Sequence, residues 1–181
     1  MAERIANIIL LVEDSCQDRL MRRYLQRLGQ DHRNIRSRIS PKGRGSAEQF
    51  VREQYALQVQ AIRTRSTKAC LIAMIDADTG STDDRRQQLD GALQLSGQAA
   101  RKPEEPILNL IPKRNVETWI LCLNLTQVDE VADYRHDSRV DPQAIRRAAQ
   151  TLFSWTRPNA QPPNTCVPSL RGCLPEFDRM G

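Results

Sequence analysis

Carboxylates stand directly after two apolar runs of the sequence. Glu13 ends the first run, and Asp76 and Asp78 follow the second. Mg²⁺ takes oxygen ligands and is commonly held by one or two carboxylates together with a substrate phosphate. Alternate residues of an extended chain point to the same side, so an Asp-x-Asp pair can face one ion. These three residues predict a site for Mg²⁺ or Mn²⁺ that serves phosphodiester chemistry.

Two more charged residues follow a third apolar run. Lys113 comes directly after that run, and Glu117 lies one helical turn further along. Sites in open α/β sheets form outside the carboxyl ends of the strands, so these residues would share one edge of the sheet. A structural interpretation stays open beside the chemical one, because acidic residues such as Asp14 and Asp78 often only cap helices.

Apolar runs of strand length alternate with segments whose apolar residues recur at helical spacing. The runs are continuous, which is typical of strands buried on both faces of a parallel sheet. We therefore predict an α/β fold with an open, mostly parallel, Rossmann-like sheet and helices on both faces. Clear strands are expected at 5–12, 69–75 and 107–111, a short one between Ile35 and Ile39, and helices at 15–28, 46–63, 81–95, 115–123 and 141–153.

The pattern changes near the C-terminus. Residues 154–181 contain Pro158, Pro162, Pro163, Pro168 and Pro175. Proline lacks a backbone N–H and interrupts helices. We therefore expect an α/β domain over residues 1–153 and an irregular, proline-rich tail over 154–181 that packs on it.

Composition narrows the class of protein. The 181 residues are 39% hydrophobic and 27% charged, and the net charge of +5 favours a polyanionic partner. No apolar run reaches the roughly 18 residues of a membrane span, and the start of the chain lacks the apolar core of a signal peptide. Five cysteines cannot form a complete disulfide framework. A cytoplasmic protein that does not enter a membrane is expected.

A basic, glycine-flanked loop precedes one of the expected helices. Lys42 and Arg44 lie in it, directly before the capping residue Ser46. Such a loop can hold phosphate through backbone N–H groups and the helix dipole, and its cations can follow a nucleic-acid backbone. We assign nucleic-acid binding to Lys42 and Arg44, and also to Arg114. A plain polar connection is the alternative for this loop.

Two of the motifs resemble the TOPRIM domain, which topoisomerases, bacterial primases, some small ribonucleases and the overcoming-lysogenization-defect nucleases share. They are the strand Ile8–Val12 ending in Glu13, and the strand Leu71–Ile75 ending in Asp76-Ala-Asp78. The stretch Ile111–Trp119 looks like the later, Glu-containing segment of small stand-alone TOPRIM-like proteins. The resemblance covers about residues 5–124.

The chain departs from the family pattern at two positions. Asp14 stands where the family usually has glycine. Gln17 stands four residues after Glu13, where nuclease members often have a second acid.

The resemblance implies roles for the site residues. Glu13 would act as general acid or base, and Asp76 and Asp78 would bind Mg²⁺. Glu117 would be a further ligand or would hold one, and Lys113 would steady the charge that builds on phosphate.

The resemblance also implies a cellular setting. Small members act beside a separate ABC or SMC-like ATPase in bacterial antiviral systems, and this chain has no ATP-binding loop of its own. The expected function is therefore a Mg²⁺-dependent nuclease or nucleic-acid-processing enzyme with an ATPase partner. Homo-oligomerisation stays open.

A second resemblance competes with the first. The segment Ile9–Asp14 and the helix after it look like the start of a response-regulator receiver, which binds Mg²⁺ with an acidic pair at this place. Receivers also need a phospho-accepting Asp at the end of the third strand. In the receiver pattern that Asp comes well before position 76, and residues 40–58 of this chain contain no Asp. A receiver-like, non-enzymatic signalling or binding module is therefore the second hypothesis.

Overall fold

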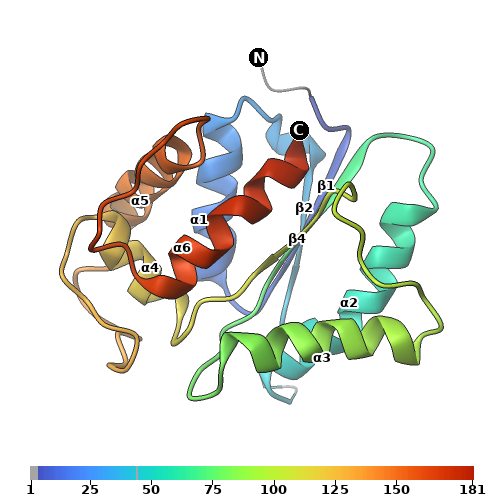
Figure 1. Ribbon diagram of the computed structural model, residues 1–181, viewed down its shortest axis with the longest axis horizontal. Coiled ribbons are helices and arrows are strands. Elements are labelled where there is room, and N and C mark those ends of the chain that lie inside the picture. Colours follow the sequence, from blue (N-terminus) through green and yellow to red (C-terminus); the bar gives the residue numbers. More distant parts are fainter. Residues whose placement is uncertain (1–3, 44) are drawn as a thin grey trace.

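A parallel sheet forms the centre of the computed structural model, which describes residues 4–43 and 45–181. In this part of the chain the sheet has four strands in the order β2-β1-β3-β4, and every neighbouring pair is parallel (Figure 1). The strands are β1 (Asn7–Val12), β2 (Ile35–Ile39), β3 (Ala69–Met74) and β4 (Ile107–Leu110). The predicted open, parallel α/β architecture is confirmed.

Helices connect the strands and cover both faces of the sheet (Figure 1). None of the helices in the described ranges is both long enough and apolar enough to cross a membrane. The helices are α1 (Ser15–Arg27), α2 (Ala47–Arg63), α3 (Thr82–Leu95), α4 (Val116–Leu123), α5 (Pro142–Trp155) and α6 (Pro168–Cys173), with short 3₁₀ segments η1 (His32–Asn34) and η2 (Leu174–Met180).

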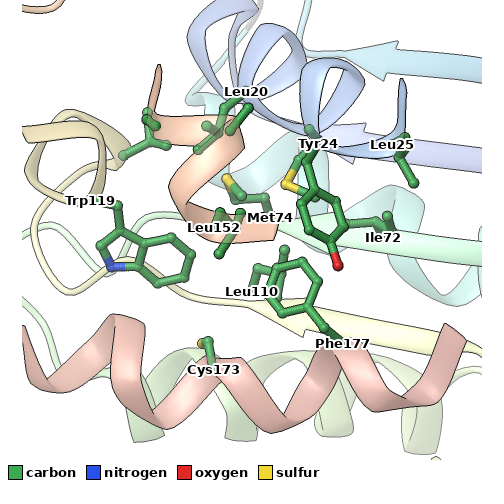
Figure 2. Packing of buried hydrophobic residues seen from close by; sticks show 14 of the residues in the cluster. Leu20, Tyr24, Leu25, Ile72, Met74, Leu110, Trp119, Leu152, Cys173 and Phe177 are labelled. Carbon is green, nitrogen blue, oxygen red and sulfur yellow. The ribbon is translucent and has the colours of Figure 1, made fainter. Parts of the chain in front are cut away.

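The alternation of side chains along β1 divides the core into two layers. Ile8 and Leu10 belong to the layer that α1, α4, α5 and the C-terminal helices cover (Figure 2). Ile9 and Leu11 belong to the layer that α2 and α3 cover. Each fully buried aliphatic side chain of this kind contributes about 1.5–3 kcal/mol to folding, so the central strands are rigid supports for the loops that follow them.

Side-chain caps fix where the helices begin. The Asp14 carboxylate accepts hydrogen bonds from the backbone N–H groups of Cys16 and Gln17 at the start of α1. Ser81 and Asp84 form a reciprocal capping box at the start of α3. These caps satisfy N–H groups that have no partner inside a helix. The turns between strands and helices are therefore short and well defined at the edge where the carboxylates lie.

The tail differs from the expected irregular segment over residues 168–180, where α6 and η2 follow one another directly. Pro168 and Pro175 lie in the first turns of these helices, where no backbone N–H is needed, so they do not interrupt them. Phe177 enters the main core and meets the ring of Tyr24 edge-on at 4.9 Å between centroids (Figure 2). The tail is therefore part of the core packing.

The structure shows which strand of the sheet precedes Asp76. The short segment Ile35–Ile39 is a true strand that pairs with β1, so the strand ending before Asp76 is the third one. The edge position of β2 explains its weak sequence signal. Its alternate residues Arg36 and Arg38 face solvent, whereas β1 and β3 are buried on both faces.

Candidate metal centre

The sheet brings Glu13 and Asp76 to the same edge. β1 and β3 are neighbours, and Leu11 pairs with Ala73 in their register. Each carboxylate therefore leaves its strand at nearly the same level, two or three residues beyond that pair. This is the edge at which open α/β sheets form their sites.

Both side chains are buried. Glu13 is 9% exposed and Asp76 is 3% exposed. The Oε1 atom of Glu13 is buried without a hydrogen-bond partner among the described residues. An ionised carboxylate in such a place is costly unless a cation or a proton compensates its charge.

Burial and mutual repulsion shift the titration of this pair upward. Burial is the main cause that raises the pKa of Glu13 to about 8, and repulsion from Asp78 adds to it. A hydrogen bond from the backbone of Asp76 works in the opposite direction. The pKa of Asp76 also lies well above its usual range, first because of burial and then because of the negative charge of Glu13. The site without metal therefore retains protons near neutral pH.

Gln17 connects the two carboxylate-bearing strands. Its side chain is fully buried, and its Nε2 donates to Asp76 Oδ1 at 2.9 Å. Its Oε1 accepts the backbone N–H of Glu13, also at 2.9 Å. One amide therefore fixes the orientation of the Asp76 carboxylate and the backbone that carries Glu13.

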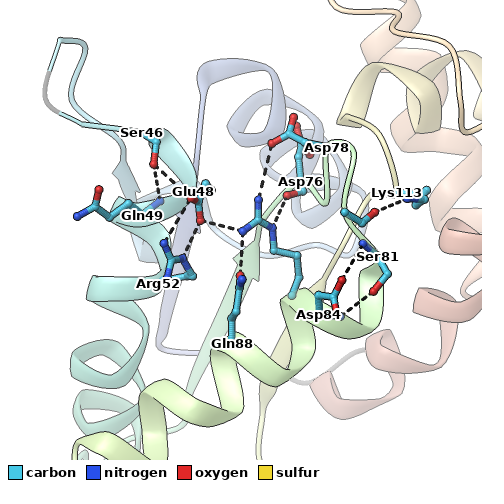
Figure 3. Close-up of polar contacts among 12 residues, drawn as sticks. Ser46, Glu48, Gln49, Arg52, Asp76, Asp78, Ser81, Asp84, Gln88 and Lys113 are labelled. Carbon is cyan, nitrogen blue, oxygen red and sulfur yellow. Dashed lines mark hydrogen bonds and ion pairs between the residues drawn. The ribbon is translucent and has the colours of Figure 1, made fainter.

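Asp78 lies at the mouth of the site. Its backbone has a φ of 50°, in the left-handed region that residues other than glycine seldom adopt. Its carboxylate is 42% exposed and pairs with Arg135 at 2.8 Å. A second guanidinium, that of Arg85, lies 3.8 Å from it (Figure 3). Asp78 would have to exchange Arg135 for a cation in order to act as a metal ligand.

Arg85 holds the turn after β3 in place. Its Nε donates to the backbone oxygen of Asp76 at 2.9 Å, and its Nη1 donates to Glu48 of α2 at 2.8 Å. The side chain is only 13% exposed. Arg85 thus links the turn, α2 and α3 through these contacts with Asp76 and Glu48.

Glu117 and Lys113 reach the same edge by different routes. Glu117 lies in the first turn of α4 and is 9% exposed. Burial raises its pKa, and repulsion from Asp14 adds to the rise. Its charge in turn contributes to the raised pKa of Asp76. Lys113 follows β4, but its ammonium donates to the backbone oxygen of Gly80 (Figure 3). The structure therefore brings Glu117 close to the carboxylates and directs Lys113 to the adjoining turn.

The predicted nucleic-acid contacts are only partly described. Lys42 is exposed in the turn between β2 and α2, on the same edge of the sheet as the carboxylates. Arg114 is half-buried and pairs with Asp133 at 3.5 Å. Arg44 lies outside the described residues.

Three residues that contact the site were not assigned to it from the sequence. Gln17 was recognised only as a departure from a family pattern. The signal that the sequence offered was its position between Asp14 and Asp18, close to Glu13. Arg85 comes four residues after the helix cap Ser81, as many surface arginines do. Arg135 belongs to a polar loop, and only the tertiary structure brings it to Asp78, 57 residues earlier in the chain.

The donor chemistry fits a hard divalent cation. Glu13 and Asp76 supply carboxylate oxygens, one of them without a partner, and Glu117 and Asp78 add negative charge. Within the part of the chain that the structure describes, no group of three or more His, Cys, Asp or Glu side chains is already arranged around a common metal position. A cation at this site would therefore draw the carboxylates together as it binds.

The titration of Glu13 leads to a prediction about metal-free stability. Its pKa in the folded state is about 8, above the ordinary value of 4.5, so the folded protein retains a proton that the unfolded chain has lost. The contribution of Glu13 to the free energy of unfolding is therefore largest below pH 4.5, and it is lost as the pH rises to 8. We expect the free energy of unfolding in EDTA to fall by up to roughly 5 kcal/mol across this window. Urea denaturation at several pH values measures it.

Glu13→Gln should remove most of that decline, because the amide cannot ionise. Glu53→Gln changes an exposed residue of α2 and should leave the wild-type profile unaltered. Parallel profiles for wild type and Glu13→Gln would show that Glu13 is an ordinary carboxylate.

The chain matches no family model, no curated protein and no solved structure. The inferences about function therefore rest on the buried carboxylates at the edge of the sheet and on the residues that hold them.

Proposed function

We propose that this protein is a Mg²⁺-dependent nuclease or nucleic-acid-processing enzyme with a TOPRIM-like site. The observation that carries the proposal is the buried Glu13 carboxylate, whose Oε1 has no partner in the described structure and whose neighbour across the sheet is the buried Asp76. Two buried acids at one strand edge are costly in the metal-free protein. A bound divalent cation would compensate that cost.

The residues of the site have distinct parts in this proposal. Asp76, with Glu13 and Glu117, would hold Mg²⁺, and Asp78 would join them after releasing Arg135. Mg²⁺ would stabilise the charge on a phosphate and lower the pKa of a bound water. The pKa near 8 belongs to the metal-free site. With Mg²⁺ bound, Glu13 would be ionised and would act as the general base that takes a proton from the attacking water. Arg135 would then be free to meet the substrate phosphate.

The partners follow from the same proposal. The basic balance of the chain suits a nucleic acid, and Lys42, Arg44 and Arg114 are the proposed backbone contacts. A separate ABC or SMC-like ATPase in a bacterial antiviral system would supply the ATP-driven step.

Metal binding and cleavage test the proposal together. The purified chain is melted in EDTA, Ca²⁺, Mg²⁺ and Mn²⁺, and is then incubated with plasmid, single-stranded DNA and RNA in the presence of each metal. We expect Mg²⁺ and Mn²⁺ to raise the melting temperature and to support cleavage. A melting temperature that no divalent cation alters would contradict the metal site itself.

A receiver-like module is the second candidate, and one observation favours it. Asp76 follows the third strand, and the acidic pair Glu13 and Asp14 follows the neighbouring first strand. A phospho-accepting Asp must be reachable by a phosphodonor, however, and Asp76 is 3% exposed with Gln17 bound to one of its oxygens. Incubation with acetyl phosphate and Mg²⁺ separates the two candidates, because only a receiver would gain 80 Da, about the mass of one phosphoryl group, at Asp76.

The basic loop leads to a prediction about salt dependence. Replacing both Lys42 and Arg44 with Ala should weaken nucleic-acid binding and reduce the slope of log K against log salt by roughly one for each lost phosphate contact. Fluorescence anisotropy between about 50 and 200 mM salt measures the slope. The matched control is Arg23→Ala with Arg27→Ala, which removes the same charge from α1, near its end opposite the Asp14 cap. Equal slopes for both double variants would make the loop a simple connection.

A further inference from the structure

Two cysteine thiols meet between α4 and the C-terminal tail. Cys122 lies in the last turn of α4, and Cys166 lies two residues before α6. The two thiol groups are near enough for each to affect the ionisation of the other. They are 44 residues apart in the chain, so the contact joins two separate segments of the fold.

Backbone groups of the tail surround the pair. The N–H of Val167 donates to Cys122 Sγ at 3.5 Å, and the Cys122 thiol lies 3.8 Å from the backbone oxygen of Thr165. Cys166 Sγ contacts the backbone oxygen of Val167 at 3.7 Å. Cys122 therefore contacts the residues on both sides of Cys166, which brings the two cysteines together.

The pair lies just beneath the surface. Cys122 and Cys166 are 4% and 5% exposed, whereas Cys70 in β3 is completely buried. Thr165 and Pro168, next to the tail cysteine and its neighbour, are exposed. Small opening motions of this proline-rich segment would admit a small oxidant.

We propose that Cys122 and Cys166 form a redox-active dithiol that a hydroperoxide oxidises to an intramolecular disulfide. The site belongs to the packing of the tail, and it does not depend on the proposed nuclease activity.

The reaction proceeds in two balanced steps. The Cys122 thiolate attacks one peroxide oxygen, the O–O bond breaks, and hydroxide leaves and takes up a proton to become water. Cys166 then attacks the sulfur of the resulting sulfenic acid, the S–O bond breaks, and a second water leaves with the Cys166 proton. The two thiols lose two electrons, and hydrogen peroxide gains them.

The surroundings determine which thiol reacts first. The hydrogen bond from Cys166 is the main cause that lowers the pKa of Cys122 to about 7, and the Val167 N–H contributes further. Glu130 and Arg171 are the charged groups nearby, and they act on this pKa in opposite directions. The same pairing raises the pKa of Cys166, which stays a thiol. Cys122 is therefore the attacking thiolate and Cys166 the resolving thiol.

Oxidation would link the tail covalently to α4. The Ser169 hydroxyl of α6 accepts hydrogen bonds from the backbone N–H of Lys113 and from the indole N–H of Trp119. A bond between α4 and the segment before α6 would reinforce these contacts and restrict the unfolded chain. The oxidised protein should therefore melt at a higher temperature than the reduced protein.

The experiment uses the full chain treated with hydrogen peroxide and mapped without reduction. We expect two of the five thiols to disappear and one tryptic species to join residues 115–135 to residues 148–171. Dithiothreitol should restore both thiols. If all five thiols persist while peroxide is consumed by other residues, or if the disulfide formed is a different one, the proposal is wrong.

Single variants assign the two thiols. Cys166→Ser should leave Cys122 as a sulfenic acid that dimedone traps, and Cys122→Ser should slow thiol loss at least about tenfold. Cys173→Ser changes another buried cysteine and should react like wild type. The peptide map of the wild-type protein decides the matter even if a variant folds poorly, and dimedone labelling of Cys166 in the wild type would overturn the assigned order.

Discussion

Asp76→Asn should lower the rate of the proposed Mg²⁺-dependent cleavage by about 10³-fold or more, which is the largest expected effect of any single change at this site. Asn preserves the size of the side chain, and its amide oxygen can still accept the hydrogen bond from Gln17. The change removes the negative charge of the proposed metal ligand two residues after the end of β3. Single-turnover cleavage with Mg²⁺ or Mn²⁺ measures the rate.

The stability of this variant should move in the opposite direction. Asp76 is buried beside Glu13, and the negative charge of Glu13 adds to the raised pKa of Asp76. Asp76→Asn removes that repulsion, so it should melt at a higher temperature than wild type in EDTA and should gain less from Mg²⁺. A variant that loses cleavage but melts at a higher temperature has lost a proposed ligand and has kept its structure.

Asp83→Asn is the matched control, because Asp83 lies exposed in the first turn of α3, just beyond the site. It should cleave like wild type. Equal cleavage by wild type and Asp76→Asn would contradict the assigned role of Asp76. If neither protein cleaves alone, the same comparison is repeated with the proposed ATPase partner.

The sheet could be predicted from the sequence because its central strands are buried on both faces. The runs that form β1 and β3 are continuously apolar, and the following helices carry clear caps. Glu13, Asp76 and Glu117 could be placed at one edge for the same reason. Parallel strands that alternate with helices leave no other edge for them.

The parts that could not be predicted depend on contacts between distant segments. β2 has polar residues that face solvent, so the sequence indicates this strand only weakly. The prolines of the tail suggest irregular structure, because the sequence does not show that Pro168 and Pro175 lie in the first turns of helices. Arg135 meets Asp78 through a loop whose path no local pattern determines.

The buried Gln17 amide contacts both the Glu13 backbone and the Asp76 carboxylate, so its replacement should have the second large effect. Gln17→Leu should lower the free energy of unfolding by roughly 2–5 kcal/mol, because it leaves the Glu13 N–H and Asp76 Oδ1 without their partner in a fully buried place. The same change should weaken the metal-dependent rise in melting temperature, since the Asp76 carboxylate loses its fixed orientation. Urea denaturation in EDTA and in Mg²⁺ measures both effects. Gln26→Leu, on the exposed face of α1, is the control.

Gln17→Glu separates the positioning role from simple packing. The new carboxylate can still accept the Glu13 N–H, but it replaces a donor to Asp76 with a negative charge. In EDTA the variant should be less stable than wild type, because three acids then share one buried edge. In Mg²⁺ it should recover more than wild type does, because a cation compensates the additional charge. If both Gln17 variants gain the same stability from Mg²⁺ as wild type, the amide fills space and does not position the metal-binding carboxylate.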